Sequence, residues 1–132
     1  MENRAFYPEK MQPPLGKYAH GVEVPEDAKL TFVAGQVGID FDGNLPEDFA
    51  SQARNVWNNC MAVLEHNRLR MSDVVKITHF ITDPKNLPAY NEVRSEFLGE
   101  SRPASTLLIV AGLVDPKFLV EVEMIAASTR RG

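Results

Sequence analysis

Two glutamates near the C-terminal end of the chain have the type and spacing that general acid–base chemistry requires. Glu121 and Glu123 alternate with apolar residues in the segment VEVEMIA, and this alternation predicts a strand that carries both carboxylates on one face, about 7 Å apart. Such a pair could orient a water molecule and act as a general base, especially if burial raises the pKa of one carboxyl group. The alternative is a structural pair that meets Lys or Arg side chains of a neighbouring subunit, and the residues alone favour neither.

A second candidate lies in the segment SRPASTLLIV, where the hydroxyl residues Ser105 and Thr106 follow an Arg-Pro-Ala turn and begin an apolar run. Hydroxyl groups donate and accept hydrogen bonds but carry no charge. If this turn and strand contact a ligand, the ligand meets neutral hydroxyl groups there. The nearest charged residue in this segment is Arg102, three residues before Ser105.

The remaining reactive side chains form no recognisable catalytic or metal-binding pattern. His20, His66 and His79 belong to three different predicted elements and have no Cys, Asp or Glu at metal-ligand spacing, so no metal site is expected. The sequence also lacks a phosphate-cradling glycine loop, a dinucleotide fingerprint and a G-x-S-x-G segment. The single cysteine, Cys60, lies in a helical pattern and is predicted to be a buried apolar residue.

Length and composition indicate one globular domain. The chain has 132 residues, of which 44% are hydrophobic and 24% charged, and this length is close to the commonest domain size. We expect a single domain over residues 1–132, in which residues 1–14, rich in proline and polar groups, form an extended arm.

The formal charge of −4 disfavours binding to nucleic acid, which needs a clustered basic surface. No stretch approaches the ~18 apolar residues of a membrane span, so no membrane partner is expected. The single Cys60 cannot form an internal disulfide, which fits a reducing, cytoplasmic setting.

The N-terminal half of the chain predicts two strands and one long helix. Lys17–Val24 and Leu30–Val37 have the composition of strands, and the segment VPEDAK between them suits a hairpin turn. Gly35 interrupts the second strand, which indicates either a bulge or a point where another group approaches the backbone closely. After a polar turn, apolar residues recur at steps of three and four from about Asp48 to Asn67, which is the pattern of an amphipathic helix.

The C-terminal half predicts a strand, a helix and two further strands. Val74–Thr82 is rich in β-branched residues and too short for a helix, so a strand is expected. Asn86 is a plausible N-cap for a second helix that Gly99 ends. The segments STLLIVAGL and FLVEVEMIA, separated by a VDPK turn, are predicted to be the last two strands.

This order of elements, β-β-α-β-α-β-β, predicts an α+β domain with two helices packed on one face of a single sheet. The segment STLLIV, residues 105–110, is largely apolar at both odd and even positions, so both faces of its strand are apolar. Two helices cover only one face of a sheet, and we therefore expect another subunit to cover the second face. The chain is predicted to form a homo-oligomer, and if the apolar residues of the last strand face the helices, Glu121 and Glu123 point toward the subunit interface.

Several further segments occur in a characteristic order along the chain. They are PPLGKYAHGV near the N-terminus, FVAGQVGID on the second predicted strand, the long segment ASQARNVWNNCMAVLEHNRLRMSDVVKITHFITD, YNEVRSEFL on the second predicted helix, and RPAS followed by VEVEMIA. In this order and spacing the chain resembles, almost from end to end, the reactive-intermediate deaminase family, also called RidA or YjgF. The resemblance implies a chorismate-mutase-like α+β fold with one mixed β-sheet, a homotrimer, and ligand sites in the clefts between subunits.

The resemblance also implies an activity and a set of site residues. Catalytic members of the family hydrolyse enamine and imine intermediates derived from amino acids to 2-oxo acids and ammonia, without a metal or an organic cofactor. The family's site corresponds here to Tyr18, Gly35, Asn91 and Glu121, with Glu121 placed to help activate water. A small-molecule ligand is the expected partner, and no cofactor is expected.

The chain departs from the family at position 105. Deaminating members have an arginine directly after the Pro-Ala dipeptide, which holds the substrate carboxylate through two parallel hydrogen bonds, whereas the residue here is Ser105. A hydroxyl group supplies neither the charge nor the fork geometry, so 2-imino acids are expected to bind poorly. Arg102 is a candidate substitute, and Leu107 makes this side of the pocket more apolar. Ser105, Thr106 and Leu107 are therefore expected to contact a neutral or less polar ligand.

Three functions remain open on the sequence. The first is a hydrolase of an enamine, imine or similar unstable intermediate that lacks the usual carboxylate, with Glu121 positioning water and Tyr18 contacting the ligand. The second is a non-catalytic binding protein whose intersubunit clefts hold a metabolite. The third, an endoribonuclease or translation-inhibitor role attached to some relatives, is disfavoured by the acidic balance of the chain.

Overall fold

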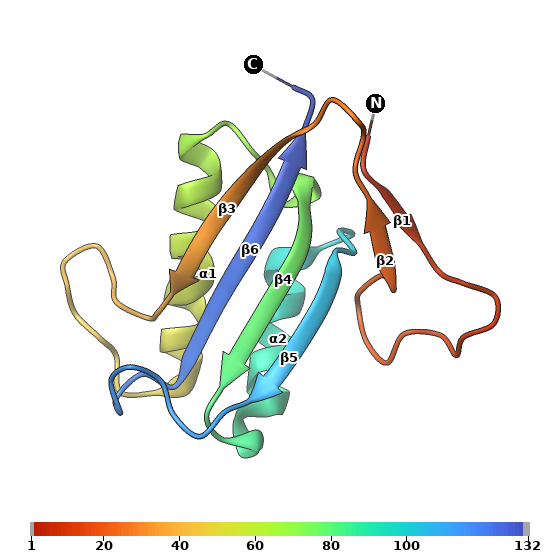
Figure 1. Ribbon diagram of the computed structural model, residues 1–132. Helices are drawn as coiled ribbons and strands as arrows, with labels where there is room; N and C mark the ends of the chain where they lie inside the picture. The colour runs from red at the N-terminus through yellow and green to blue at the C-terminus, as the bar shows by residue number, and fades with distance from the viewer. Residues whose placement is uncertain (1, 131–132) are drawn as a thin grey trace.

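One layer of the protein is a four-stranded mixed sheet with the strand order β3-β6-β4-β5 (Figure 1). In the computed structural model, which describes residues 2–130, these strands are β3 (Lys29–Gln36), β6 (Val120–Ser128), β4 (Val74–Ile81) and β5 (Ala104–Ile109). β6 runs antiparallel to both of its neighbours, whereas β4 and β5 run parallel to each other. A parallel pair needs a crossover connection, which the helix α2 (Leu87–Leu98) provides.

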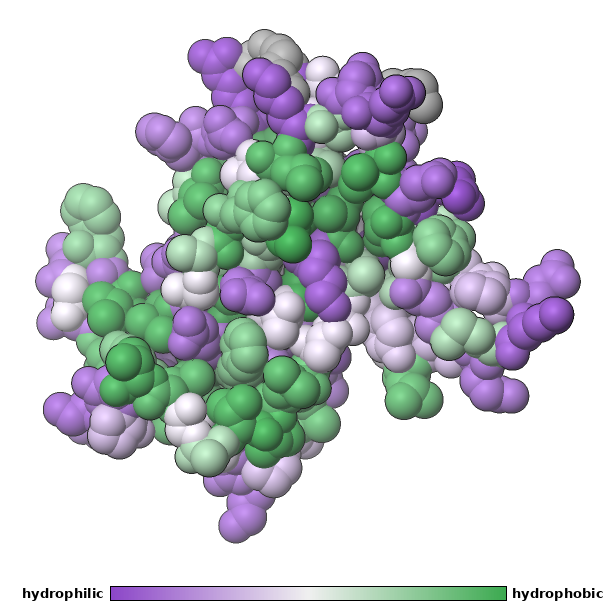
Figure 2. All heavy atoms as spheres, in the orientation of Figure 1, coloured by the Kyte–Doolittle hydropathy of each residue, from purple (hydrophilic) through white to green (hydrophobic). Residues whose placement is uncertain are grey.

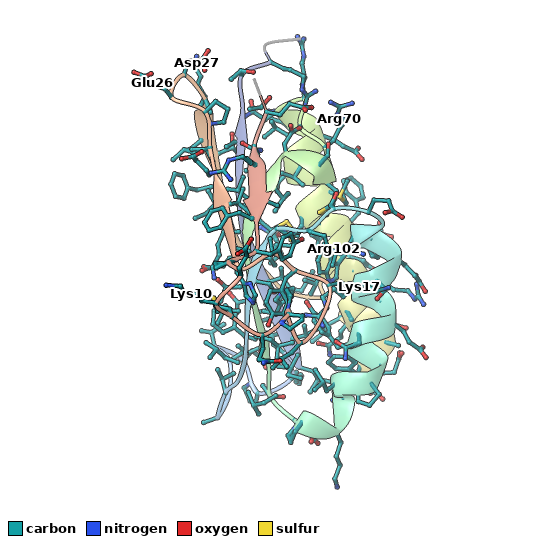
Figure 3. The ribbon with its side chains drawn as sticks, turned by 90° about the vertical axis from the view of Figure 1, so that its right-hand side faces the viewer. Lys10, Lys17, Glu26, Asp27, Arg70 and Arg102 are labelled. Carbon is teal, nitrogen blue, oxygen red and sulfur yellow. The ribbon has the colours of Figure 1, made fainter. Side chains whose placement is uncertain are left out.

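The second layer consists of α2 and the longer helix α1 (Phe49–His66), both on the same face of the sheet, as the edge-on view of Figure 3 shows. Asp48 caps α1 by accepting a hydrogen bond from the Ser51 amide. Gly99 ends α2 with a φ of 53°, a conformation that glycine adopts without steric cost. Two short 3-10 helices, η1 (Met71–Asp73) and η2 (Pro84–Asn86), precede β4 and α2. The predicted α+β fold, with two helices on one face of a mixed sheet, is confirmed.

The core lies between the sheet and the helices. Val120, Val122 and Met124 of β6 are buried on the helix side, whereas the alternating Glu121 is half-buried and Glu123 is exposed. α1 buries the face that its periodicity predicts, including the fully enclosed Trp57 and Cys60. Burial of each large apolar side chain contributes about 1.5–3 kcal/mol, and this packing fixes which face of the sheet each strand residue occupies.

A separate two-stranded ribbon lies beside the β5 edge of the sheet (Figure 1). It pairs β1 (Arg4–Phe6), which lies within the predicted N-terminal arm, with β2 (Gly21–Glu23). The predicted hairpin between residues 17–24 and 30–37 is therefore wrong, because β2 pairs with β1 and β3 pairs with β6. The ring of Phe6 occupies the space above Gly21, where a Cβ atom would lie 2.3 Å from the ring, so the glycine permits this alternative pairing.

The other face of the sheet, called the open face below, is covered by neither helix, and apolar side chains gather on it (Figure 2). Phe32 of β3 is 68% exposed and Leu108 of β5 is 44% exposed. The predicted alternation along β5 is confirmed: Ser105 and Leu107 lie on the helix face, and Thr106 and Leu108 lie on the open face. Apolar groups gathered on one sheet face are typical of a surface that another molecule covers.

Candidate functional site

Glu121 lies on the open face of β6 and its side chain passes directly over Gly35 of β3. A Cβ atom added at Gly35 would lie 2.0 Å from Oε2 of Glu121, so any larger residue at this position would displace the carboxylate. Among residues 2–130 the Glu121 side chain has neither a hydrogen bond nor an ion pair with protein groups, although it is half-buried. Both interpretations of Gly35 are realised, because the register of β3 against β6 shifts between Val33 and Gln36 and the Glu121 side chain also approaches the glycine closely. The carboxylate is left available to water or a ligand.

Ser105 lies at the end of a buried row of polar side chains, which we call the relay and which consists of Tyr90, His79 and Ser105. Nε2 of His79 lies 2.9 Å from the Ser105 hydroxyl oxygen, and Nδ1 of His79 is hydrogen-bonded to the Tyr90 hydroxyl. Tyr90 lies on α2, His79 on β4 and Ser105 on β5. His79 is 1% exposed and Tyr90 is 0% exposed, whereas Ser105 is half-buried and forms the outer end of the relay.

The surroundings of the relay keep its histidine uncharged. Burial, followed by the nearby charges of Arg94 and Lys76, lowers the pKa of His79 to about 3. Burial raises the pKa of Tyr90 well above its usual range. The indole of Trp57 acts in the opposite direction on that hydroxyl, but no hydrogen bond of normal geometry joins the two groups. A neutral imidazole carries one donor and one acceptor nitrogen, so the relay has a defined direction.

Aromatic packing holds the relay in place. The ring of His79 meets that of Tyr90 edge to face, with centroids 5.4 Å apart. Trp57 lies 6.0 Å from His79 on its other side and stacks in turn on Phe97. This network is not predicted from the sequence, where His79 is considered only as a possible metal ligand. The signal for it was a histidine at a helix-facing position between Ile77 and Ile81, since a buried polar group requires hydrogen-bond partners.

Tyr18 and Asn91 lie on the β5 side of the molecule. Tyr18 accepts a hydrogen bond from the Leu15 amide at 3.1 Å. Its neighbour Ala19 is tied to the start of β5, because its amide donates to the Pro103 carbonyl and the residue bridges to Ala104. Asn91 follows Tyr90 on α2, is half-buried, and accepts a hydrogen bond from Arg94.

Three other residues expected to contact a ligand differ in their accessibility. Arg102, labelled in Figure 3, donates two hydrogen bonds of 2.8 Å to the Gly99 and Ser101 carbonyls, so its guanidinium is bound to the connection between α2 and β5. Thr106 lies on the opposite face from Ser105, where its hydroxyl accepts a hydrogen bond of 2.7 Å from Lys76. Leu107 packs partly buried against the core.

Within one chain the predicted site residues therefore form two groups on opposite faces of the sheet. Glu121 and Gly35 lie on the open face at β6 and β3. Ser105 and Leu107 lie on the helix face of the edge strand β5, on the side of the molecule where Tyr18 is also found. A single chain does not bring the proposed water-activating carboxylate to the relay.

Other reactive side chains stand apart from both groups. Residues 2–130 contain no cluster of three or more His, Cys, Asp or Glu placed to hold a metal ion. In the same part of the chain, neither helix has the length and apolar character needed to cross a membrane. Burial raises the pKa of Cys60 to about 12, so its thiol stays protonated at neutral pH. The ring of His20 lies 6.1 Å from Tyr7 and 6.4 Å from Tyr18, and its Nδ1 is buried without a hydrogen bond.

Comparison with known proteins places this fold and sequence in one family. A family model described as Endoribonuclease L-PSP matches residues 9–128. A RutC family protein of Pyrococcus abyssi is 36% identical over 129 residues, which cover 96% of this chain and 98% of that protein. The 2-iminobutanoate/2-iminopropanoate deaminase of Dermatophagoides farinae is 34% identical over 115 residues, covering 85% of this chain and 86% of that protein. A Rid-family protein of unknown function from Yersinia pestis has a crystal structure that matches with a TM-score of 0.86 at 28% identity, covering 97% of this chain and 100% of that one.

These similarities run over nearly the whole chain and agree with two helices packed on a mixed sheet. The chain belongs to the RidA/YjgF family, to which the L-PSP description also applies. Some members of this family carry names that describe imine or reactive-intermediate deaminases.

Proposed function

We propose that this protein hydrolyses an enamine or imine that lacks the carboxylate of 2-imino acids, at a site formed between two subunits. The observation that carries this proposal is the setting of Glu121, a half-buried carboxylate seated over Gly35 and without a protein partner among residues 2–130. A carboxylate in this setting can take a proton from water and return it to a leaving nitrogen.

The reaction follows from this single base. The oxygen of a water molecule bonds to the imine carbon while Glu121 accepts a water proton and passes it to the nitrogen. The second proton of that water then moves to the nitrogen, the C–N bond breaks, and the products are a carbonyl compound and ammonia. The name of the Dermatophagoides relative describes deamination of imines, which supports this class of reaction for the present chain.

A site between subunits is supported by the separation of the two groups of residues. Glu121 lies on the open face and Ser105 on the helix face, so a second copy must supply one group if both act on the same ligand. The apolar open face, with Phe32 68% exposed, offers a surface for such a copy. A homotrimer is the assembly that the family resemblance implies. Sedimentation of the wild type should give a trimer that Phe32→Glu dissociates without unfolding the subunit, and a monomeric wild type would remove the intersubunit site.

The substrate preference is supported by the residue at position 105. The relay offers a hydroxyl there, and Arg102 is bound to backbone carbonyls. A carboxylate that leaves water for this position would lose its hydration without gaining a charged partner. The ligand at this point is therefore a neutral group.

The test is hydrolysis of two imines generated in situ, 2-iminopropanoate and an analogue with an amide in place of the carboxylate. The wild type should hydrolyse the neutral analogue faster, and Ser105→Arg should increase hydrolysis of 2-iminopropanoate. Glu121→Gln should lower kcat by at least about 100-fold. Glu123→Gln is the matched control, because its carboxylate lies on the same strand face but is exposed, and it should retain the wild-type rate.

Two results would redirect this proposal. Full activity in Glu121→Gln would remove this residue from the mechanism. Saturable binding of the neutral analogue without product would favour the alternative of a metabolite-binding protein.

A further inference from the structure

The protons of the relay can be assigned from burial alone. Tyr90 is 0% exposed, and among residues 2–130 the hydrogen bonding of its hydroxyl group runs to Nδ1 of His79 alone. A buried hydroxyl group that cannot donate its proton costs about 1–3 kcal/mol. The Tyr90 hydroxyl therefore donates to Nδ1, which must be the unprotonated nitrogen of the ring.

The opposite assignment would leave a buried donor unsatisfied. If Nδ1 carried the proton and donated to Tyr90, the phenolic proton would have no acceptor inside the core. Ser105 has no such constraint, because it is half-buried at the outer end of the relay and its proton can reach solvent or a ligand. Because Tyr90 is enclosed and Ser105 is not, the hydrogen bonds of the relay run from Tyr90 through His79 to Ser105.

It follows that Nε2 of His79 carries the ring proton and donates it to the Ser105 oxygen, 2.9 Å away. The Ser105 hydroxyl thus already accepts a hydrogen bond from inside the protein. Its own proton is then free to point away from His79, and Ser105 presents a donor to whatever binds beside it. In this state His79 cannot act as a base for Ser105, because Nε2 has no free lone pair.

We propose that Ser105 is a specificity-determining residue that donates a hydrogen bond to a neutral carbonyl oxygen of the ligand, and that Tyr90 and His79 are positioning residues that orient this donor. This inference rests on the proposed function, since it places the ligand in the same site, and it names the group that replaces the substrate carboxylate. The ligand class is an imine or enamine with an adjacent amide or ketone carbonyl.

The surroundings of Ser105 favour a neutral oxygen over a carboxylate. Three cations direct their donor groups to other parts of the protein and none donates a hydrogen bond to Ser105: Arg94 donates to Asn91, Lys76 to Thr106 on the open face, and Arg102 to backbone carbonyls. Leu107, the next residue on the same strand face, adds an apolar contact. One neutral donor beside an apolar group suits a carbonyl oxygen, which needs a single hydrogen bond and carries no charge to desolvate.

Binding of product-like compounds tests this inference without depending on turnover. Calorimetric titration of the Glu121→Gln protein with pyruvamide and with pyruvate compares a neutral amide with a carboxylate of the same size. We expect pyruvamide to bind about 10-fold more tightly than pyruvate, and Ser105→Ala to abolish this preference. Equal binding of the two compounds, a preference for pyruvate, or no binding of either would overturn the inference. If the protein does not hydrolyse imines but still prefers pyruvamide, the proposed function is wrong and the role of Ser105 stands. The hydrolysis and binding experiments therefore test the two proposals separately.

Matched variants separate the donor from general damage to the site. Ser105→Thr retains a hydroxyl group and should retain the preference for pyruvamide. Thr31→Ala removes a hydroxyl from β3, at the opposite edge of the sheet from β5, and should change neither affinity. Tyr90→Phe removes the proton that sets the histidine tautomer and should reduce the preference about 3-fold, and an unchanged preference would remove Tyr90 from the relay.

The tautomer itself can be observed. Long-range proton–nitrogen NMR spectra distinguish a protonated Nε2 from a protonated Nδ1 in a neutral histidine, and we expect Nε2–H for His79. An Nδ1–H tautomer would reverse the direction of the relay and make Ser105 a candidate nucleophile. In that case a sulfonyl fluoride would label Ser105 in the wild type but not in His79→Gln. Labelling of this kind would overturn the inference, whereas an unlabelled Ser105 together with Nε2–H supports it.

Discussion

The two faces of the sheet differ in how completely their polar groups are partnered. On the helix face, the side chains of Tyr90 and His79 are almost fully enclosed and each makes a hydrogen bond to the next. On the open face, the carboxylate of Glu121 is half-buried and has no protein partner among residues 2–130. The first arrangement comes from β4, β5 and α2, whereas the Glu121 carboxylate and the glycine beneath it come from β6 and β3.

This difference indicates a division of roles between the faces. A buried and fully satisfied network is rigid, because breaking any of its bonds leaves a polar group without a partner in a region of low dielectric. An unpartnered carboxylate beside apolar groups is instead available for a ligand, for water or for a second copy of the chain. In the proposed mechanism, the helix face fixes the position of one donor, Ser105, and the open face supplies the base, Glu121.

The largest expected effect is on stability and distinguishes the packed face from the open one. Trp57→Ala should lower the free energy of unfolding by about 3–5 kcal/mol, because it removes a fully buried ring. Phe32→Ala, at a side chain that is 68% exposed, should change the unfolding of a monomer by less than about 0.5 kcal/mol. Denaturant titration at two protein concentrations measures both. A loss for Phe32→Ala that appears only at high concentration reports its part in assembly, and an equal loss for both variants at low concentration would contradict the comparison.

Gly35→Ala tests whether the open face is organised around Glu121. The added Cβ would meet the far end of the Glu121 side chain at 2.0 Å, so the carboxylate must move while the backbone can stay. We expect a loss of about 100-fold in kcat, as displacement of a catalytic group by about 1 Å produces, with the melting temperature nearly unchanged. Gly112→Ala is the control, because a Cβ there meets no atom within 4 Å. Wild-type turnover in Gly35→Ala would show that the position of this carboxylate is unimportant.

The dependence of stability on pH isolates the helix face. The pKa of His79 is lowered to about 3, whereas an unfolded histidine has a pKa of about 6.5. Between these values the unfolded chain binds a proton that the folded chain does not, so stability falls as the pH decreases from about 6.5 toward 3. The slope from this one group is at most about 1.4 kcal/mol per pH unit. The matched variant His79→Gln, whose amide can still accept from Tyr90 and donate to Ser105, should lose less stability over this interval, and equal slopes would mean that His79 titrates normally.

Much of the fold could be predicted from the sequence, because the strongest patterns are local. The periodicity of α1 and the alternation of β6 each specify an element and its buried face within a few residues. The pairing of β2 could not be predicted in this way, since the turn after it suits a hairpin with β3 and the competing partner β1 is only three residues long. Pairing depends on contacts that are distant in sequence, here the fit of Phe6 over Gly21.

The candidate site was predicted less completely than the fold. Family resemblance gave Glu121 and Gly35, and the structure explains the pair by direct contact between them. The relay was missed because its three members are 11 and 26 residues apart in sequence and none belongs to a known catalytic motif. Their proximity arises from the parallel pairing of β4 with β5 and from the packing of α2 on that pair.

The smallest expected effect concerns a hydrogen bond that joins β4 to β5 on the open face, as the bond between His79 and Ser105 does on the helix face. Lys76 donates to Thr106 at 2.7 Å on the open face, while His79 is bonded to Ser105 at 2.9 Å on the helix face. Thr106→Val should change the free energy of unfolding by less than about 0.5 kcal/mol, because water replaces an exposed hydrogen bond at little cost. Ser105→Val should cost about 1–3 kcal/mol, since it leaves the donor on His79 without a partner. Denaturant unfolding of the two variants gives this difference directly, and equal losses would mean that burial does not distinguish the two faces of the β4–β5 pair.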